Sequence, residues 1–166
     1  MMKKLLLTQN KYTIIDDRDF KKLSQYKWYA YKHRYTFYAV RNFRIKSGYG
    51  GQRRIFMHQS ILPPPQNKII DHINGNGLDN RRNNLRLCSF KENCHNRRVG
   101  LANSSGYKGV SFHKLNQKWQ AQIETSKNGF RKNNYLGLFD NIKDAAIAYN
   151  GAALKYFGNF AYLNKI

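Results

Sequence analysis

Residues 69–98 read IIDHINGNGLDNRRNNLRLCSFKENCHNRR, and the rest of the chain is interpreted from this stretch outward. Ile69–His72 is a short apolar run that ends in two polar side chains, and Leu85–Cys88 alternates apolar and polar residues, so both favour β-strands. Two consecutive Asn-Gly pairs at Asn74–Gly77 are typical of a turn between them. The first two thirds of the stretch therefore predict a pair of short strands joined by a loop.

A helix is predicted directly after the second strand. Ser89 is followed three residues later by Glu92, which is a capping box in which each side chain reaches the backbone N–H of the other residue. The helix should run to about Arg98. The whole stretch is then a compact strand–loop–strand–helix unit.

The polar side chains of this unit have the chemistry of a metal-dependent nuclease. Asp71 offers carboxylate oxygen and Asn93 offers amide oxygen, which are hard ligands suited to Mg²⁺. His72, with an ordinary pKa of about 6.5, suits a general base that activates water. Asn84 can accept a hydrogen bond from the other imidazole nitrogen and so fix the tautomer. Together they predict hydrolysis of a phosphodiester bond.

Simpler interpretations exist for each part. Asn-Gly pairs mark ordinary turns, and an Asp-His pair by itself is more often a surface hydrogen bond than a site. Cys88, Cys94 and His95 raise the alternative of zinc, but structural zinc sites use closely paired ligands such as Cys-x-x-Cys, which this stretch lacks. The combination of residues, rather than any one of them, carries the functional interpretation.

This stretch resembles the HNH nucleases with a ββα-metal fold, especially homing endonucleases of introns and phages. The matching residues are Asp71-His72, then Asn84 thirteen positions after Asp71, then Asn93 nine positions later, with Asn80-Arg81 and Asn84-Leu85-Arg86 in the same frame. The resemblance implies Asp71 and Asn93 as metal ligands, His72 as general base and Asn84 as the residue that orients it. Asparagine at the helical ligand position, where other forms have histidine, favours an oxygen-liking metal, Mg²⁺ with Mn²⁺ as the alternative, over zinc.

Composition points to a polyanionic partner. The 166 residues include 30 Lys and Arg against 9 Asp and Glu, a formal net charge of +21. Such a charge repels itself within a fold, so double-stranded DNA is the expected partner, with neither a membrane nor a small-molecule cofactor. No long uncharged apolar run, basic amphipathic helix or signal-peptide core is found. Two cysteines make no disulfide framework, which favours a reducing cytoplasm. The resemblance to phage nucleases implies the cytoplasm of a bacterium or a phage-infected cell.

The N-terminal region is predicted to be rich in strands. Two short strands are expected within residues 3–15, a helix over 16–23, and further strands at 28–31, 35–44 and 53–57. The aromatic side chains of these strands favour a sheet core over base stacking. Four arginines could follow phosphates, namely Arg41, Arg44, Arg53 and Arg54. For His58, in a short helical segment before Pro63–Pro65, phosphate contact and packing are both open.

The region after the nuclease unit is predicted to be a separate domain. Residues 99–106 are a small, polar linker, and Arg97 and Arg98 before it are expected to lie against DNA. Strands are predicted at 107–112, 118–125 and 132–138, followed by a helix over 141–157 that Asn141 caps and Gly158 ends. The inward face of this helix is predicted to comprise Ala145, Ala146, Ala148, Tyr149, Ala152, Ala153 and Tyr156. One helix covers one face, so the other face of the sheet is open for DNA.

This C-terminal part resembles the APETALA-two/ERF DNA-binding domain. The resemblance rests on Tyr-Lys-Gly-Val at 107–110, Trp-x-Ala-x-Ile at 119–123, Tyr-Leu-Gly-x-Phe at 135–139, Ala-Ala-x-Ala-Tyr at 145–149 and Leu-Asn at 163–164. The predicted DNA contacts are Lys108, Ser111, His113, Lys118, Gln120, Gln122, Lys132 and Tyr135. Because serine, histidine and glutamate stand at 111, 113 and 124 in place of the family's arginines, the target sequence of plant members is not inherited. Trp119 and Ile123 are expected in the core.

Taken together, the sequence predicts an α+β protein with a strand-rich N-terminal region and a ββα-metal nuclease core, followed by a three-stranded antiparallel sheet packed on one helix. The expected domains are 1–98, with the core at about 68–98, a linker at 99–106, and 107–166. The predicted function is a homing-type endonuclease that nicks duplex DNA as a monomer or weak dimer. The alternatives are a DNA-binding regulator with a degenerate nuclease fold and, less favoured, an RNA-binding protein.

Overall fold

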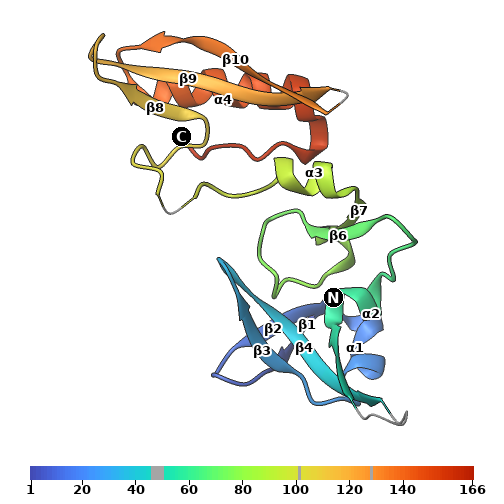
Figure 1. The fold of residues 1–166 in the computed structure, drawn as a ribbon. Coiled ribbons are helices and arrows are strands. Elements are labelled where there is room, and N and C mark those ends of the chain that lie inside the picture. The colour runs from blue at the N-terminus through green and yellow to red at the C-terminus, as the bar shows by residue number, and fades with distance from the viewer. Residues whose placement is uncertain (46–50, 101, 128) are drawn as a thin grey trace. The chain divides into compact units, whose positions relative to one another are not determined.

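The computed structural model describes residues 1–45, 51–100, 102–127 and 129–166 and divides into two compact units. The first comprises Met1–Lys91 and the second Glu92–Ile166 (Figure 1). Leu101, in the predicted linker, lies outside the described residues. The fold is α+β and consists of several small antiparallel sheets, which confirms the predicted class.

The first unit contains small antiparallel sheets and short helices. Its elements are β1 (Met2–Leu6) paired with β2 (Tyr12–Asp16), α1 (Asp17–Leu23), the sheet of β3 (Tyr29–His33), β4 (Thr36–Ile45) and β5 (Gly51–Phe56), α2 (Met57–Ile61), β6 (Ile69–His72), the 3-10 turn η1 (Arg82–Asn84), and β7 (Leu85–Cys88), which pairs with β6. The strands predicted at 69–72 and 85–88 are present with those bounds. The core of this unit gathers apolar residues from nearly every element: Leu7, Ile15, Leu23, Trp28, Ala30, Ala39, Met57, Ile61 and Leu85.

The sheet β3–β4–β5 has two faces with different neighbours. Residues that stand opposite each other on paired strands share a face, and successive residues alternate. Ala30 pairs with Ala39 and both are in the core, so they define the core face. Tyr31 pairs with Tyr38, and these side chains lie on the opposite face.

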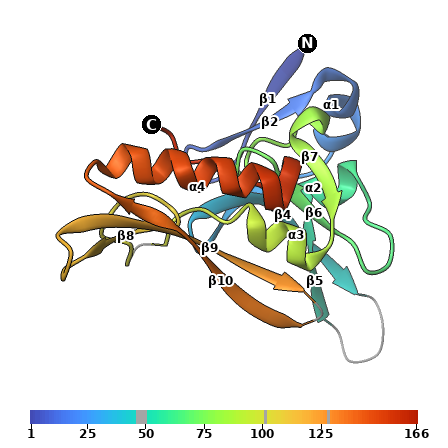
Figure 2. The same cartoon turned by 90° about the horizontal axis from the view of Figure 1, so that it is seen from above.

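The second unit is a three-stranded antiparallel sheet with a long helix against one face (Figure 2). Its elements are β8 (Val110–His113), β9 (Lys118–Lys127), β10 (Phe130–Phe139), α4 (Ile142–Phe157) and the 3-10 turn η2 (Gly158–Phe160). The Asn141 side chain accepts a hydrogen bond from the Lys143 backbone N–H at 2.8 Å, so the predicted helix cap is confirmed.

Small residues let α4 approach the sheet closely. Ala145, Ala146, Tyr149 and Ala153 are buried, as predicted, whereas Tyr156 is 48% exposed and the prediction for it was wrong. A Cβ on Gly109 would lie 2.1 Å from the Tyr149 ring, and its φ of +73° belongs to the left-handed region that favours glycine. The turn at this glycine delays the start of β8 to Val110, three residues later than predicted.

The helix α3 (Phe90–His95) begins at the end of the first unit and is shorter than the predicted helix. Arg97 and Arg98 therefore follow the helix rather than belonging to it. Among the described residues, no helix is both long and apolar enough to cross a membrane.

Candidate nuclease site

His72 lies at the end of β6 and is held by a buried amide. Its side chain is only 5% exposed, and its Nε2 lies 3.2 Å from the Asn80 Oδ1. The Asn80 Nδ2 donates to the Thr13 hydroxyl at 2.8 Å, which leaves Oδ1 facing the imidazole. Because that oxygen can only accept, Nε2 carries the hydrogen and Nδ1 is the nitrogen able to take up a proton. This is the tautomer that a general base acting through Nδ1 needs.

The loop between β6 and β7 is tied to β2, and this fixes Asn80. The Ile14 N–H donates to the Leu78 carbonyl and the Asn80 N–H donates to the Ile14 carbonyl, both at 2.8 Å. Thr13, which is fully buried, donates to the Leu78 carbonyl at 2.9 Å. The imidazole is thus oriented by a strand some sixty residues earlier in the chain.

Asn84 does not contact the imidazole as the sequence analysis expected. Its Oδ1 accepts from the Asn74 N–H at 3.0 Å, and its Nδ2 donates to the Asn74 Oδ1 and to the Asp79 carbonyl at 3.0 and 2.8 Å. These bonds brace both ends of the loop that presents Asn80. A role for Asn84 in catalysis stays a prediction, and the structure makes that role indirect.

Asp71 stands opposite Arg86 in the β6–β7 pair, and the two form an ion pair. Arg86 Nε and Nη2 lie 2.8 and 2.6 Å from Asp71 Oδ2. Asp71 is 7% exposed, so this contact is largely shielded from water. A cation bound at Asp71 would share the carboxylate with a guanidinium.

The donors present fit a cation that keeps most of its own water. Among the described residues, no group of three or more His, Cys, Asp or Glu side chains is arranged to hold a metal ion. The first unit offers the Asp71 carboxylate, and Mg²⁺ is commonly bound through one or two carboxylates, waters and a substrate phosphate. Asn93 lies in α3, in the second unit, and its role as a second ligand stays a prediction.

His58 packs against His72 in an aromatic cluster. The two rings are edge-to-face with centroids 5.1 Å apart, and Tyr38 lies 5.6 Å from His58 and 5.7 Å from His72. His58 is 9% exposed, so of its two open roles the structure gives it packing. Burial is the main cause that lowers the pKa of His58, with the neighbouring His72 adding to it, to about 3.

Burial also lowers the pKa of His72 from its ordinary value. The hydrogen bond to Asn80 and the charges of Asp71 and Asp79 oppose this effect. The net result is a neutral imidazole at neutral pH, which is the form that can accept a proton.

We expect the free energy of unfolding to fall as the pH is lowered from 6.5 toward 3. The unfolded chain binds a proton on His58 below pH 6.5, whereas the folded chain binds it only near pH 3. The contribution of His58 to the free energy of unfolding is therefore fully present above pH 6.5 and is lost as the pH falls toward 3. The loss amounts to up to about 5 kcal/mol, at roughly 1.4 kcal/mol per pKa unit. Urea unfolding at a series of pH values measures the slope. His58→Phe should flatten it, and an unchanged slope would assign the pH dependence to other groups.

A cavity of about 250 Å³ opens beside the histidines. Its lining combines the β3–β5 sheet, α2 and β6, through His33, Tyr38, Phe56, His58, Gln59 and Ile70. It therefore lies next to the ring that contacts His72 and has a largely aromatic wall.

The four arginines predicted to follow phosphates are divided between the two faces of the β3–β5 sheet. Arg41 and Arg53 share the core face, because Arg41 pairs with Ile55 and Arg53 with Phe43. Arg41 is held there by its own chain, with the guanidinium 4.0 Å from the centre of the Tyr26 ring. Arg44 and Arg54 lie on the face of Tyr38. One DNA surface cannot meet all four side chains on this sheet.

In the second unit, strand register fixes the open face. It carries most of the predicted contacts: Ser111, His113, Lys118, Gln120, Gln122 and Tyr135. Lys132 pairs with Thr125, which shares the helix-covered face of Ile123, so its predicted place was wrong. β10 begins at Phe130. Because successive residues of a strand point to opposite faces, a shift of one residue in the pairing moves every side chain to the other face. Arg131, exposed and 3.6 Å from Glu124, stands on the open face instead.

Lys108, another predicted DNA contact, is turned toward its own chain. Its Nζ donates to the carbonyls of His95 and Arg97 at 2.7 and 2.8 Å. Burial is the main cause that lowers the pKa of Lys108, to about 8, and the charge of Arg97 adds to it. In this structure the Lys108 side chain holds the chain segment after α3 and does not extend from the open face of the sheet.

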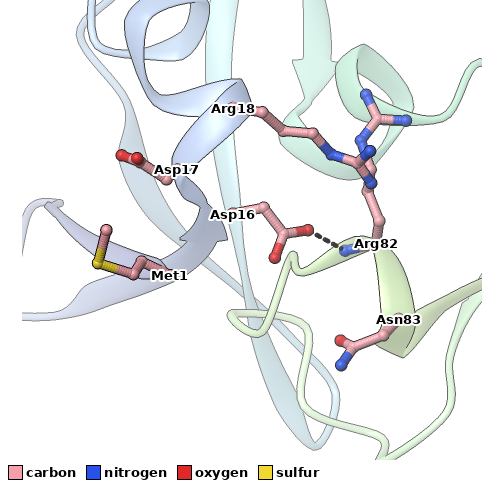
Figure 3. A pocket seen from close by; sticks show the side chains of 6 residues that line it. All are labelled: Met1, Asp16, Asp17, Arg18, Arg82 and Asn83. Atoms are coloured by element: carbon pink, nitrogen blue, oxygen red, sulfur yellow. Dashed lines mark hydrogen bonds between the residues drawn. The ribbon is translucent and has the colours of Figure 1, made fainter.

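A second cavity, of about 520 Å³, contains none of the predicted site residues (Figure 3). Its lining comprises Met1, Asp16, Asp17, Arg18, Arg82 and Asn83. The Asp16 carboxylate accepts from the Arg82 N–H at 2.8 Å, and the Arg82 guanidinium pairs with Asp19 at 2.8 Å. These contacts attach the turn before β7 to α1, so the cavity marks a structural junction.

Sequence reasoning missed three residues that the structure brings to His72. Asn80 and Tyr38 contact the imidazole, and Arg86 pairs with the adjacent Asp71. The register of two four-residue strands could have indicated Arg86, since it places Arg86 opposite Asp71. Asn80 was among the matching residues as part of Asn80-Arg81, but its role was not predicted, because the contacts that aim it at the imidazole come from β2.

Comparisons with known proteins agree with this geometry. A family model described as HNH endonuclease matches residues 63–95. The chain is 30% identical over 154 residues to "Uncharacterized HNH endonuclease L560" of Acanthamoeba polyphaga mimivirus, covering 87% of this chain and 70% of that protein.

Two further relatives match part of the chain. It is 38% identical over 76 residues to "Protein 3.8" of Escherichia phage T7, covering 45% of this chain and 63% of that protein. Its C-terminal part is similar to "Dehydration-responsive element-binding protein 2D" of Arabidopsis thaliana, with 36% identity over 86 residues, 51% of this chain and 40% of the plant protein. The chain thus spans less than two thirds of the length of these two relatives.

Proposed function

We propose that this chain, which belongs to the HNH endonuclease family, is a homing-type endonuclease that nicks duplex DNA at a site selected by its C-terminal sheet. The observation that carries the proposal is the buried His72, oriented by Asn80 next to the Asp71 carboxylate. A neutral imidazole whose Nε2 is bound to Asn80 can accept a proton on Nδ1, as a general base must.

His72 takes the proton of the attacking water on Nδ1, while Asn80 keeps the imidazole in the required orientation. Asp71 and, as the family resemblance implies, Asn93 would hold a divalent cation, Mg²⁺ or Mn²⁺. Such a cation would supply charge stabilisation at the scissile phosphate and the leaving oxygen. Hydrolysis leaves a 3′ hydroxyl and a 5′ phosphate. One such centre cuts one strand, so a monomer nicks and a double-strand break needs a weak dimer or two sequential nicks.

The open face of β8–β10 positions the enzyme on duplex DNA. Its exposed polar and aromatic side chains can enter a groove, and the similarity to the APETALA-two/ERF proteins supports DNA as the partner. We assign residues 1–98 to cutting, 99–106 to the linker and 107–166 to site selection. The phage origin of one relative supports a bacterium or a phage-infected cell as the setting, and we infer its cytoplasm as the compartment.

The experiment that tests the proposal is a supercoiled-plasmid assay with Mg²⁺, with Mn²⁺, or with a chelator. We expect conversion to nicked circles with either metal and none with the chelator. Linear product that appears without a nicked intermediate would argue for a dimer. Plasmid that carries matching target DNA and stays supercoiled with both metals would refute the endonuclease proposal.

A second candidate is a DNA-binding regulator that has lost its nuclease activity. The ion pair of Asp71 with Arg86 favours it, because a guanidinium already compensates the carboxylate that would bind metal. In that case the wild-type chain shifts duplex DNA without cutting it. Metal would then change neither the affinity nor the product.

A further inference from the structure

A row of aromatic rings runs from His72 across one face of the β3–β5 sheet. The His72 ring lies 5.7 Å from Tyr38, Tyr38 lies 5.8 Å from Phe56, and Phe56 lies 6.5 Å from Tyr31, measured between ring centroids. These four side chains, which we call the aromatic row, all lie within the first unit. Three of them belong to the sheet face opposite the core.

Arg54 closes the far end of the aromatic row. Its guanidinium lies 4.0 Å from the centre of the Tyr31 ring, which is a cation–π contact. On β3 the Tyr29 hydroxyl donates to the Asn42 Oδ1 at 2.9 Å. Arg54 is exposed, and the Tyr31 ring gives its guanidinium a defined place. A planar, oriented guanidinium is the group that binds phosphate bidentately.

The cavity of about 250 Å³ lies along the same row. Tyr38 and Phe56 form part of its wall, and His58 and Gln59 add polar groups. Arg54 stands two residues before Phe56 on β5, about 7 Å along the strand. The backbone position of Arg54 is therefore separated from that of the cavity residue Phe56 by roughly the spacing of one nucleotide.

We propose that the aromatic row, its cavity and Arg54 form a subsite for the strand that is cut, with a nucleotide in the cavity and its outer phosphate on Arg54. Aromatic faces accept any base by stacking, so the subsite is insensitive to sequence. Arg53, on the core face, takes no part in it. The inference rests on the proposed function, because it uses His72 to define where the cut occurs.

The test compares Arg54→Ala with Lys32→Ala in the full-length chain. Lys32 is an exposed cation next to Tyr31 on β3 and pairs with Phe37, so it points to the other face. Affinity for a duplex of fixed sequence is measured against salt concentration in the His72→Ala background, with chelator present. We expect Arg54→Ala to reduce the salt slope by about one, and Lys32→Ala to leave it unchanged.

The variant Arg54→Lys separates placement from charge. Lysine keeps the charge but cannot lie flat on Tyr31 with two parallel hydrogen bonds. We expect the salt slope of the wild type together with a nicking rate about tenfold lower at saturating enzyme.

Three results would overturn the subsite: an unchanged slope in Arg54→Ala, an equal loss in Lys32→Ala, or full nicking by Arg54→Lys. Because binding is measured without cutting, the comparison of salt slopes tests whether DNA contacts Arg54 even if the wild type nicks no plasmid. A wild type that nicks no plasmid but shows the expected slopes would refute the endonuclease proposal and leave the Arg54 face as a DNA-binding surface.

Discussion

His72→Ala should lower the nicking rate by about a hundred- to ten-thousand-fold while leaving duplex affinity unchanged. The range is the usual contribution of a positioned general base. Affinity should persist because His72 is buried and neutral, so it adds nothing to the charge that attracts DNA. The measurement is single-turnover conversion of supercoiled plasmid with Mg²⁺, paired with a mobility shift in chelator.

Lys32→Ala is the control, because Lys32 is an exposed side chain of the same unit on the sheet face opposite Tyr38. It should nick at close to the wild-type rate. Circular dichroism confirms that both variants fold. If His72→Ala nicks as fast as Lys32→Ala, the imidazole is not the general base, and another group must activate the water.

Raising salt from 50 to 200 mM should weaken duplex binding by about a thousand- to a hundred-thousand-fold. This is the cost for a protein that neutralises roughly six to ten phosphates and releases their counterions. A net charge of +21 over 166 residues can supply that number from both units. Fluorescence anisotropy of a labelled duplex, titrated at several salt concentrations, gives the slope.

The His72→Ala protein should have the same salt slope as the wild type, since catalysis and charge neutralisation are separate here. Single-stranded DNA and duplex RNA, titrated in parallel, test whether duplex DNA is preferred. A duplex affinity that hardly changes with salt concentration would contradict the inference that the positive charge of this chain binds DNA phosphates. A clear preference for RNA would favour the alternative that this chain is an RNA-binding protein.

Local patterns predicted the elements of both units well. A short apolar run identified β6, alternation identified β7, and the small residues of the last helix identified the face that packs on the sheet. These predictions succeed because residues close in sequence determine them. The ends of α3 and β8 were wrong because tertiary contacts end or delay an element that local propensity would continue.

The sequence by itself determined the family, the partner implied by charge, and the residues Asp71 and His72. Tertiary structure decided their partners: Asn80 on the imidazole, where Asn84 was expected, and Arg86 on the carboxylate. It also placed Lys132 on the helix-covered face of the C-terminal sheet, and Arg41 and Arg54 on opposite faces of the N-terminal one. The physical reason is that a motif fixes which groups are close along the chain, whereas strand register and loop attachment fix which groups meet across it.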